Sequence, residues 1–229
     1  MTLNVKALDL SWHDEFNGSE LDTTKWIYEE NFRHEAQNSR DAVFVENGCL
    51  NIGIFTKNKK HHTAIISTEG KFEAAKGYWE VRARFNDKPG TWSDAWLYSS
   101  TVPSIIGNVN KAGMEIDIFE HRSHNQNGKN ISSLVTRGMH WDGYEEHHKN
   151  VAIDHIIEPG FHTYGLLWTD SKYEFYYDDV MMWSAGPTTT KPLHFLLSTE
   201  VGYLPYWTIK PLDNFHNVTM QVDYVRYYH

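Results

Sequence analysis

Residues 78–85 read YWEVRARF and alternate strictly between apolar and polar side chains. Trp79, Val81, Ala83 and Phe85 share one face of an extended chain, and the polar positions share the other. A period of two over this length is typical of a strand buried on one side. The segment therefore predicts a β-strand with Trp79 in a hydrophobic core and a wet opposite face.

The same pattern continues in both directions along the chain. Residues 161–168 alternate likewise, and turns at residues 170–171 and 178–179 lead into 172–177 and 180–183, which predicts an antiparallel meander. Further strand candidates are residues 42–46, 49–55, 64–67, 92–98, 114–120, 133–140, 194–199 and 218–227. Short strands without crossover helices predict an all-β jelly-roll β-sandwich of two antiparallel sheets, as a single domain over residues 1–229. The polar stretches 31–41, 103–113, 121–130 and 142–154 are expected to be loops.

Composition restricts the class of protein. The chain has 229 residues, 40% of them hydrophobic, which fits one large core and excludes a disordered or collagen-like class. Lys and Arg total 21 and Asp and Glu total 30, and the formal net charge of −9 argues against nucleic-acid or anionic-membrane partners. The single cysteine, Cys49, cannot form an internal disulfide. No apolar run approaches the ~18 residues of a membrane span.

Residues 113–120, GMEIDIFE, place three acids among large apolar side chains. Simple alternation puts Glu115 and Asp117 on one face but sends Glu120 into the core, which is costly for an unpaired carboxylate. One β-bulge at Ile118 and Phe119 brings all three acids to the open face. The sequence therefore predicts a bulged strand that carries a row of carboxylates.

The spacing of these carboxylates suits a known type of catalysis. A strand rise of roughly 3.3 Å per residue puts the glutamate Cα atoms about 12 to 14 Å apart, and side chains that lean inward bring the carboxyl groups close together. Retaining glycosidases hold two carboxyl groups about 5 to 5.5 Å apart, one as nucleophile and one as acid. Asp117 between them raises the pKa of the glutamate that must hold a proton. The residues alone do not say which glutamate does which, and a solvated or cation-binding acidic face is the alternative.

The same stretch resembles the bulged E-x-D-x-x-E signature of the family 16 glycoside hydrolases, which include laminarinases, agarases and carrageenases. The resemblance continues through residues 14–18, 21–22, 25–26, 48–52, 77–82, 90–96, 161–164, 168–169 and 222–226. It implies a concave cleft and hydrolysis of internal β-linkages with retention. By position, Glu115 matches the nucleophile, Glu120 the acid/base and Asp117 the residue that assists the nucleophile. It also favours a secreted protein, although the first residues lack the apolar stretch of a signal peptide.

Aromatic and polar residues are candidates for substrate contact. Trp92 and Trp96 share a strand face and match the family pattern G-x-W-x-x-x-W, whose tryptophans stack on sugar rings; core packing is the alternative. The intervening residues 93–95 read SDA, where the family commonly has an apolar sequence. His140 is expected to face the cleft and bond Asp117 or a sugar hydroxyl. The other candidates are Trp141, Glu200, Arg33, Asn38, Tyr206 and Trp207.

Catalysis is expected to need no cofactor, but the sequence raises the question of a structural calcium site and of a zinc site. The resemblance implies a structural calcium ion bound by oxygen atoms of Glu15, Gly48 and Asp223, far from the acids. Zinc is disfavoured, because the spacing of the four candidate histidines matches no zinc motif. Those histidines are His121, His124, His147 and His148.

The sequence thus predicts a retaining endo-β-glycanase that acts on a polysaccharide. A β-1,3-glucan of the laminarin type is the leading substrate, and a β-galactan such as agarose or carrageenan is the alternative. Two other readings are a carbohydrate-binding module without hydrolysis and a transglycosylase, in which a sugar resolves the covalent intermediate. The acidic surface favours a monomer.

Overall fold

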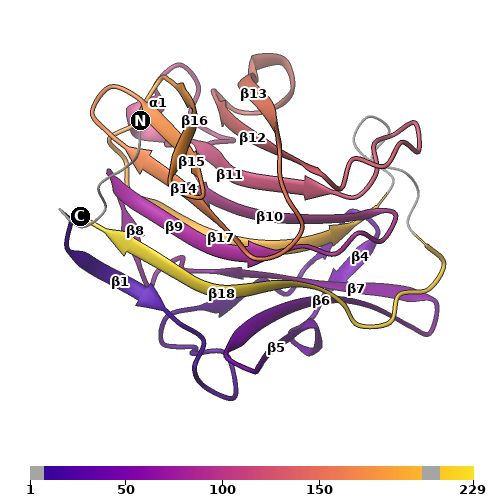
Figure 1. The fold of residues 1–229 in the computed structure, drawn as a ribbon. Coiled ribbons are helices and arrows are strands. Elements are labelled where there is room, and N and C mark those ends of the chain that lie inside the picture. Colours follow the sequence, from indigo (N-terminus) through magenta and orange to yellow (C-terminus); the bar gives the residue numbers. More distant parts are fainter. Residues whose placement is uncertain (1–7, 203–211) are drawn as a thin grey trace.

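The computed structural model describes residues 8–202 and 212–229, and these residues form two packed β-sheets (Figure 1). β18 has β9 along one edge and β6 followed by β1 along the other, and β14, β15 and β16 extend the sheet beyond β9. The strands of this first sheet are β1 (Leu10–Asp14), β5 (Val43–Glu46), β6 (Cys49–Lys57), β9 (Gly77–Arg84), β14 (His162–Trp168), β15 (Tyr173–Tyr177), β16 (Val180–Ala185) and β18 (Val218–Tyr228).

The second sheet is antiparallel and carries the acids on its central strand. It runs β7, β17, β10, β11, β12, β13, with β2 and β8 as short additions. Its strands are β2 (Ile27–Tyr28), β7 (Lys60–Ser67), β8 (Glu73–Ala74), β10 (Thr91–Tyr98), β11 (Glu115–Arg122), β12 (Leu134–Trp141), β13 (Lys149–Ile156) and β17 (Leu193–Val201). The β6–β7 hairpin joins the two sheets, and β4 (Ala36–Asn38), paired with β3 (Phe32–Arg33), runs parallel to β7.

Helical structure in the described residues is confined to single turns. These are α1 (Val109–Ala112), η2 (Arg40–Ala42) and η3 (Glu145–His147). No helix among residues 8–202 and 212–229 is long and apolar enough to cross a lipid bilayer.

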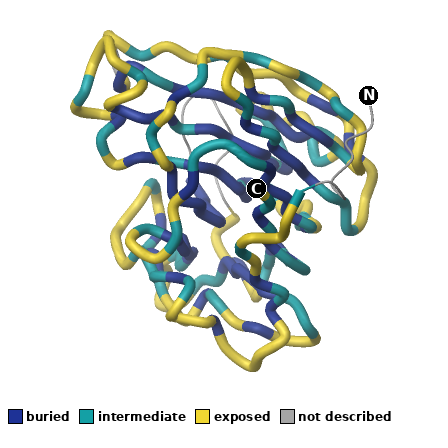
Figure 2. The backbone as a smooth tube through the Cα atoms, turned by 90° about the vertical axis from the view of Figure 1, so that its left-hand side faces the viewer, coloured by how far each residue is buried: buried dark blue, intermediate teal, exposed yellow. Residues whose placement is uncertain are grey.

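The core lies between the inner faces of the two sheets. Trp79 of β9 stacks on Phe195 of β17 with ring centroids 5.1 Å apart, and Phe119 of β11 meets Tyr164 of β14 at 4.8 Å. Buried positions run along the strands, and exposed positions gather in the connecting loops (Figure 2). The apolar face predicted for residues 78–85 is thus confirmed at Trp79, Val81 and Ala83, which are fully buried.

Three expectations about local structure were wrong in whole or in part. Residues 31–41 are not all loop, because β3 and β4 lie within them. Lys149–Ile156 is a strand and not part of a loop; among the described residues it pairs only with β12, and most of its side chains are exposed, so no alternation of burial marks it. The outer face of β9 is wet only toward its C-terminal end: Arg84 is exposed and Arg82 half-buried, but Tyr78 and Glu80 are buried. β9 lies inside the sheet, and neighbouring side chains cover it: the Tyr224 hydroxyl donates to Glu80 at 2.9 Å.

The predicted bulge in β11 is present. Asp117 pairs with Gly138 and Glu120 with Thr136, so Ile118 and Phe119 lie opposite Arg137 alone. Both bulge side chains are fully buried in the core. The bulge therefore turns Glu120 away from the core and onto the same face as Asp117.

Candidate active site

The outer face of the second sheet carries the acids at positions that face one another across neighbouring strands. Across the strand pairs, Glu115 lies opposite His140, Trp96 opposite Asp117, Asp94 opposite Glu120, and Trp92 opposite Glu200. Their side chains surround one cavity of about 210 Å³. It is lined by Arg33, Trp92, Asp94, Trp96, Glu115, Asp117, Glu120, His140, Tyr144, His148 and Glu200.

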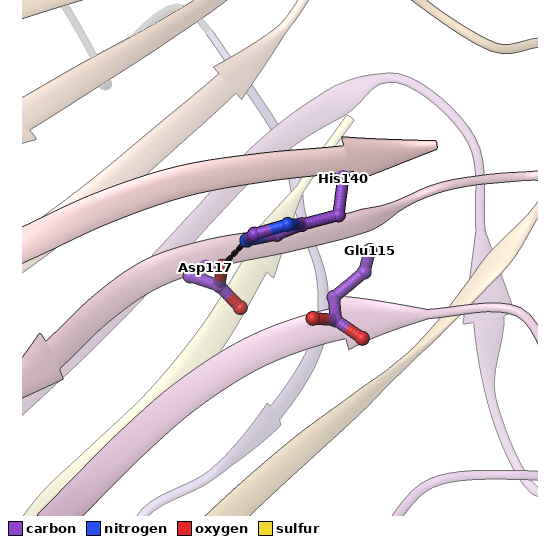
Figure 3. Close-up of side chains that lie close together, drawn as sticks. All are labelled: Glu115, Asp117 and His140. Atoms are coloured by element: carbon purple, nitrogen blue, oxygen red, sulfur yellow. Dashed lines mark ion pairs between the residues drawn. The ribbon is translucent and has the colours of Figure 1, made fainter. Parts of the chain in front are cut away.

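The three predicted catalytic acids meet in this cavity. Oxygen atoms of Glu115 and Asp117 and a ring nitrogen of His140 all lie within 4.8 Å of one another (Figure 3). Burial and the neighbouring Asp117 raise the pKa of Glu115 to about 7 and hold the pKa of Glu120 well above its usual range. Such perturbed carboxyl groups in a cavity are typical of acid/base chemistry.

His140 supplies positive charge among these acids. Its Nε2 lies 3.2 Å from Oδ2 of Asp117, and its Nδ1 lies 2.8 Å from Nε2 of His148. Burial opposes the charged imidazolium, but the hydrogen bond and the charge of Asp117 prevail and raise the pKa of His140 to about 9. Burial and the adjacent His140 lower the pKa of His148. A charged His140 therefore forms an ion pair with Asp117 through Nε2 and donates its Nδ1–H to His148.

Tyr144 reaches the site from the loop between β12 and β13. Its hydroxyl donates a hydrogen bond to Oε2 of Glu115 at 2.5 Å. This bond favours the charged form of Glu115, in opposition to burial and Asp117. Neither Tyr144 nor His148 was singled out as a substrate or catalytic residue from the sequence, because their positions depend on how that loop folds back over β11.

Arg33, His34 and Glu200 form an ionic cluster at the other side of the cavity. Nε of Arg33 lies 3.1 Å from Oε1 of Glu200, and Nε2 of His34 lies 2.5 Å from Oε2. Burial disfavours the charge on Glu200, but these two partners lower its pKa, so it is a carboxylate. The Arg33 guanidinium also lies 5.9 Å from the ring centre of Trp96.

Two predicted substrate residues lie outside the cavity lining. Trp141 packs against the main hydrophobic core. Asn38 is 2% exposed and bonded within the protein, to Asn31 at 2.5 Å and to the Thr63 hydroxyl at 2.9 Å. These contacts within the fold keep both residues out of the cavity lining, and a role for either in substrate binding stays a prediction. Residues 206 and 207 lie outside the described part of the chain.

The residues expected to bind calcium lie close together on the first sheet. Glu15 follows Asp14, which pairs with Val225 of β18. Gly48 precedes β6, which pairs with residues 218–222 of β18, and Asp223 lies between these two paired stretches. Arg226 donates two hydrogen bonds to the carboxylate of Glu15, each of 2.8 Å, and Arg82 donates to Asp223. The expected ligand atom of Glu15 is a backbone oxygen, which the contact with Arg226 does not involve. The guanidinium of Arg82 offsets the charge of the Asp223 carboxylate and so makes it a weaker ligand for a hard divalent cation. The calcium ion stays a prediction, and the chemistry below does not depend on it.

The histidines considered for zinc do not gather around a common point. His121 is buried with its Nε2 2.9 Å from the carbonyl oxygen of Ser132, whereas His148 contacts His140. Within residues 8–202 and 212–229, the one cluster with metal-ligating atoms close enough together is that of Glu115, Asp117 and His140.

Comparison with known proteins places this arrangement in a family. The model of the family described as "Beta-porphyranase A-D, GH16 domain" matches residues 7–229. Glucan endo-1,3-beta-glucosidase A1 of Niallia circulans is 25% identical over 269 residues, which cover 98% of this chain and 38% of that protein. Beta-porphyranase B of Phocaeicola plebeius is 27% identical over 223 residues, covering 77% of this chain and 67% of that protein.

Solved structures agree with the fold. The laminarinase from Flavobacterium sp. UMI-01 superposes with a TM-score of 0.75 at 26% identity, covering 96% of this chain and all of the other. The endo-beta-1,3-glucanase from Pyrococcus furiosus superposes with a TM-score of 0.79 at 24% identity, covering 96% and 94%. The chain spans little more than a third of the first curated relative. Together with the bulged row of acids, the match of residues 7–229 shows that the chain belongs to the GH16 glycoside hydrolases, in the family of the beta-porphyranase A–D GH16 domains.

Proposed function

We propose that this chain is a retaining endo-β-glycanase, with Glu115 as nucleophile, Glu120 as acid/base and Asp117 as the residue that orients Glu115. The observation that carries the proposal is the bulge in β11, which places all three acids on one face of the strand and in one cavity. Retaining hydrolysis needs such a pair of close carboxyl groups.

The mechanism proceeds in two steps. The carboxylate of Glu115 attacks the anomeric carbon of the sugar, while Glu120 donates its proton to the departing glycosidic oxygen, which leaves a covalent glycosyl-enzyme. Glu120 then takes a proton from water, and the resulting hydroxide displaces Glu115 with a second inversion at the same carbon. The raised pKa of Glu120 keeps it protonated for the first step.

Neighbouring groups tune the charges in this mechanism. Tyr144 donates to Glu115 and supports its charged form. The imidazolium of His140 bonds Asp117 and offsets the negative charge that two adjacent acids would otherwise concentrate. Trp92 and Trp96 offer flat apolar surfaces on which sugar rings stack.

The polymer is a β-galactan of the agar type, because the family model that matches residues 7–229 is that of the beta-porphyranases. This reverses the order of substrates expected from the sequence. A β-1,3-glucan is the second candidate, supported by the 25% identity with the Niallia circulans glucanase over 98% of the chain. Because such polymers are too large to cross a cell membrane, we propose that the enzyme acts outside the cytoplasm.

The test compares the wild type with Glu115→Gln on agarose, porphyran, carrageenan, laminarin and mixed-linkage glucan. We expect one polymer to be cut internally by the wild type, and the variant to be slower by at least about a thousand-fold, because amide cannot act as the nucleophile. Reducing ends measure the rate, and NMR of the first anomer released reports retention.

Glu46→Gln, a change of an exposed glutamate on β5 of the first sheet, is the matched control and should keep full activity. Three results would contradict the proposal. Inversion at the anomeric carbon would exclude the covalent intermediate. Retardation of the wild type in a polymer-containing gel without any cleavage would favour a binding module, and transfer to an added acceptor sugar would identify a transglycosylase.

A further inference from the structure

Asp94 is an acid of the cavity that the reaction described above does not use. It lies on β10 between Trp92 and Trp96, opposite Glu120 on one neighbouring strand and opposite Ser198 on the other. Its side chain lines the cavity, yet the residue is only 5% exposed. An acid at this depth needs either a partner or a function.

The two oxygen atoms of Asp94 differ in their surroundings. Oδ2 accepts a hydrogen bond of 3.0 Å from the Ser198 hydroxyl, whose oxygen in turn accepts from Nε1 of Trp96 at 3.2 Å. Oδ1 is buried and has no hydrogen-bond partner among the described residues. The chain from Trp96 through Ser198 therefore fixes the orientation of the carboxyl group and leaves one oxygen free for a ligand.

Burial, together with the neighbouring Glu200, Glu120 and Asp117, raises the pKa of Asp94 well above its usual range, which favours the protonated carboxyl group. Because Oδ2 accepts from Ser198, Oδ1 is the oxygen that can carry the proton. A buried O–H without an acceptor costs free energy, and a sugar hydroxyl can both accept this proton and donate in return.

We propose that Asp94 binds a hydroxyl group of an uncharged sugar ring held over β10 between Trp92 and Trp96. The proposal rests on the proposed function and specifies its substrate at one position of the cavity. We expect an uncharged ring there because the cationic side chains that line this cavity are already paired, Arg33 with Glu200 and His140 with Asp117, and offer no positive charge to a sulfate or carboxylate substituent.

The experiment measures binding of the polymers agarose and laminarin by affinity gel electrophoresis, together with kcat and KM on the one that the wild type cleaves. Asp94→Ala removes the hydrogen bond and should weaken binding and raise KM by about ten-fold. Asp94→Asn retains a donor and an acceptor in the same shape and should bind within about three-fold of the wild type. If porphyran is the polymer cleaved, its oligosaccharide products should be sequenced. The sugar ring that binds between Trp92 and Trp96 should then carry no sulfate group.

Ser93→Ala is the matched control on the same strand. Its side chain is buried on the opposite face, where Ala95 joins the core, so its loss should leave binding and KM unchanged. The melting temperature of each variant separates loss of binding from loss of folding. Unchanged binding in a folded Asp94→Ala variant would overturn the inference, as would equal losses in Asp94→Asn and Asp94→Ala.

The failure of the proposed function would look different. If the wild type binds a polymer without cleaving it, the hydrolase proposal fails, while loss of binding in Asp94→Ala still supports the present inference. If the wild type cleaves a polymer and Asp94→Ala cleaves and binds it equally well, the hydrolase proposal stands and the role of Asp94 is refuted.

Discussion

The hydroxyl of Tyr144 lies 2.5 Å from Glu115 and is the group best placed to keep this nucleophile ionised. Tyr144→Phe removes the donor but keeps the ring, so the pKa of Glu115, about 7 in the wild type, should rise further. Since the nucleophile must be deprotonated, the acid limb of kcat/KM should move to higher pH, by about one unit. A pH–rate profile measures this shift.

Tyr224→Phe serves as the control for that profile, because the Tyr224 hydroxyl donates to Glu80 on the first sheet, away from the cavity. Its acid limb should coincide with that of the wild type. An unmoved limb in Tyr144→Phe would show that the tyrosine does not influence Glu115.

At the scale of single residues, the sequence predicted the site residues that lie close together on one strand. Glu115, Asp117 and Glu120 share one strand, and Trp92 and Trp96 share another, so spacing alone was enough to group them. In the sequence, Asp94 stands out only because residues 93–95 read SDA where the family commonly has an apolar sequence. Its function could not be predicted, because its environment comes from β11 and β17, which are distant from it in sequence.

The bulge in β11 is held by Arg137 of β12. This arginine is fully buried; it donates to the carbonyl oxygen of Ile118 at 2.9 Å and to that of Tyr176 at 2.7 Å. Arg137→Met keeps the unbranched apolar stem of the side chain but leaves both buried carbonyl groups without this donor. We expect the free energy of unfolding to fall by about 2 kcal/mol or more, and kcat to fall because Glu120 loses its fixed position.

Urea denaturation and assays on the cleaved polymer check both effects. Arg84→Met is the control, since Arg84 is exposed and its loss should change stability by less than about 0.5 kcal/mol. Full activity in a destabilised Arg137→Met variant would show that the bulge keeps its shape without the arginine.

Strands with apolar side chains that face the core were predictable, including β17, which is buried throughout, whereas strands that are short or mostly exposed were missed. β13 is an edge strand with mostly exposed side chains, so its residues gave no period-two signal and were assigned to a loop. The short strands β3 and β4 also went unpredicted, although they bring Arg33 to the cavity. The bulge was predicted from energetics, because the alternative buried Glu120 unpaired.

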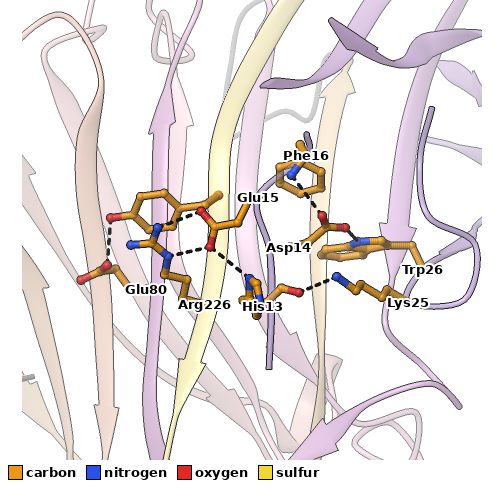
Figure 4. A network of polar contacts seen from close by, with 9 residues as sticks. His13, Asp14, Glu15, Phe16, Lys25, Trp26, Glu80 and Arg226 are labelled. Carbon is orange, nitrogen blue, oxygen red and sulfur yellow. Dashed lines mark hydrogen bonds and ion pairs between the residues drawn. The ribbon is translucent and has the colours of Figure 1, made fainter. Parts of the chain in front are cut away.

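On the scale of the whole molecule, the pairing of β1 with β18 is reinforced by an ion pair (Figure 4). Arg226 donates two hydrogen bonds to Glu15, each of 2.8 Å, and this contact lowers the pKa of Glu15. A carboxyl group with a lowered pKa in the folded state stabilises the fold above its ordinary pKa of 4.5, and this stabilisation is lost as the pH falls through the folded value.

Glu15→Gln should therefore reduce the free energy of unfolding by about 1 kcal/mol at pH 7, and the difference from wild type should shrink as the pH falls below about 4. Thermal unfolding at a series of pH values measures it. Glu20→Gln, an exposed glutamate nearby in sequence, should show no such difference at any pH. A constant deficit in Glu15→Gln from pH 7 to pH 3 would mean that packing and not charge is responsible.

β18 is the last strand in chain order, yet it lies inside the first sheet between β9 on one edge and β6 and β1 on the other. A ribosome that synthesises this chain therefore completes three strands well before the one that joins them. In that interval their edges offer unpaired N–H and C=O groups to other chains. Assembly of this sheet is thus delayed until β18 has emerged, and the exposure of these edges lasts as long as synthesis of the residues between β9 and β18 takes.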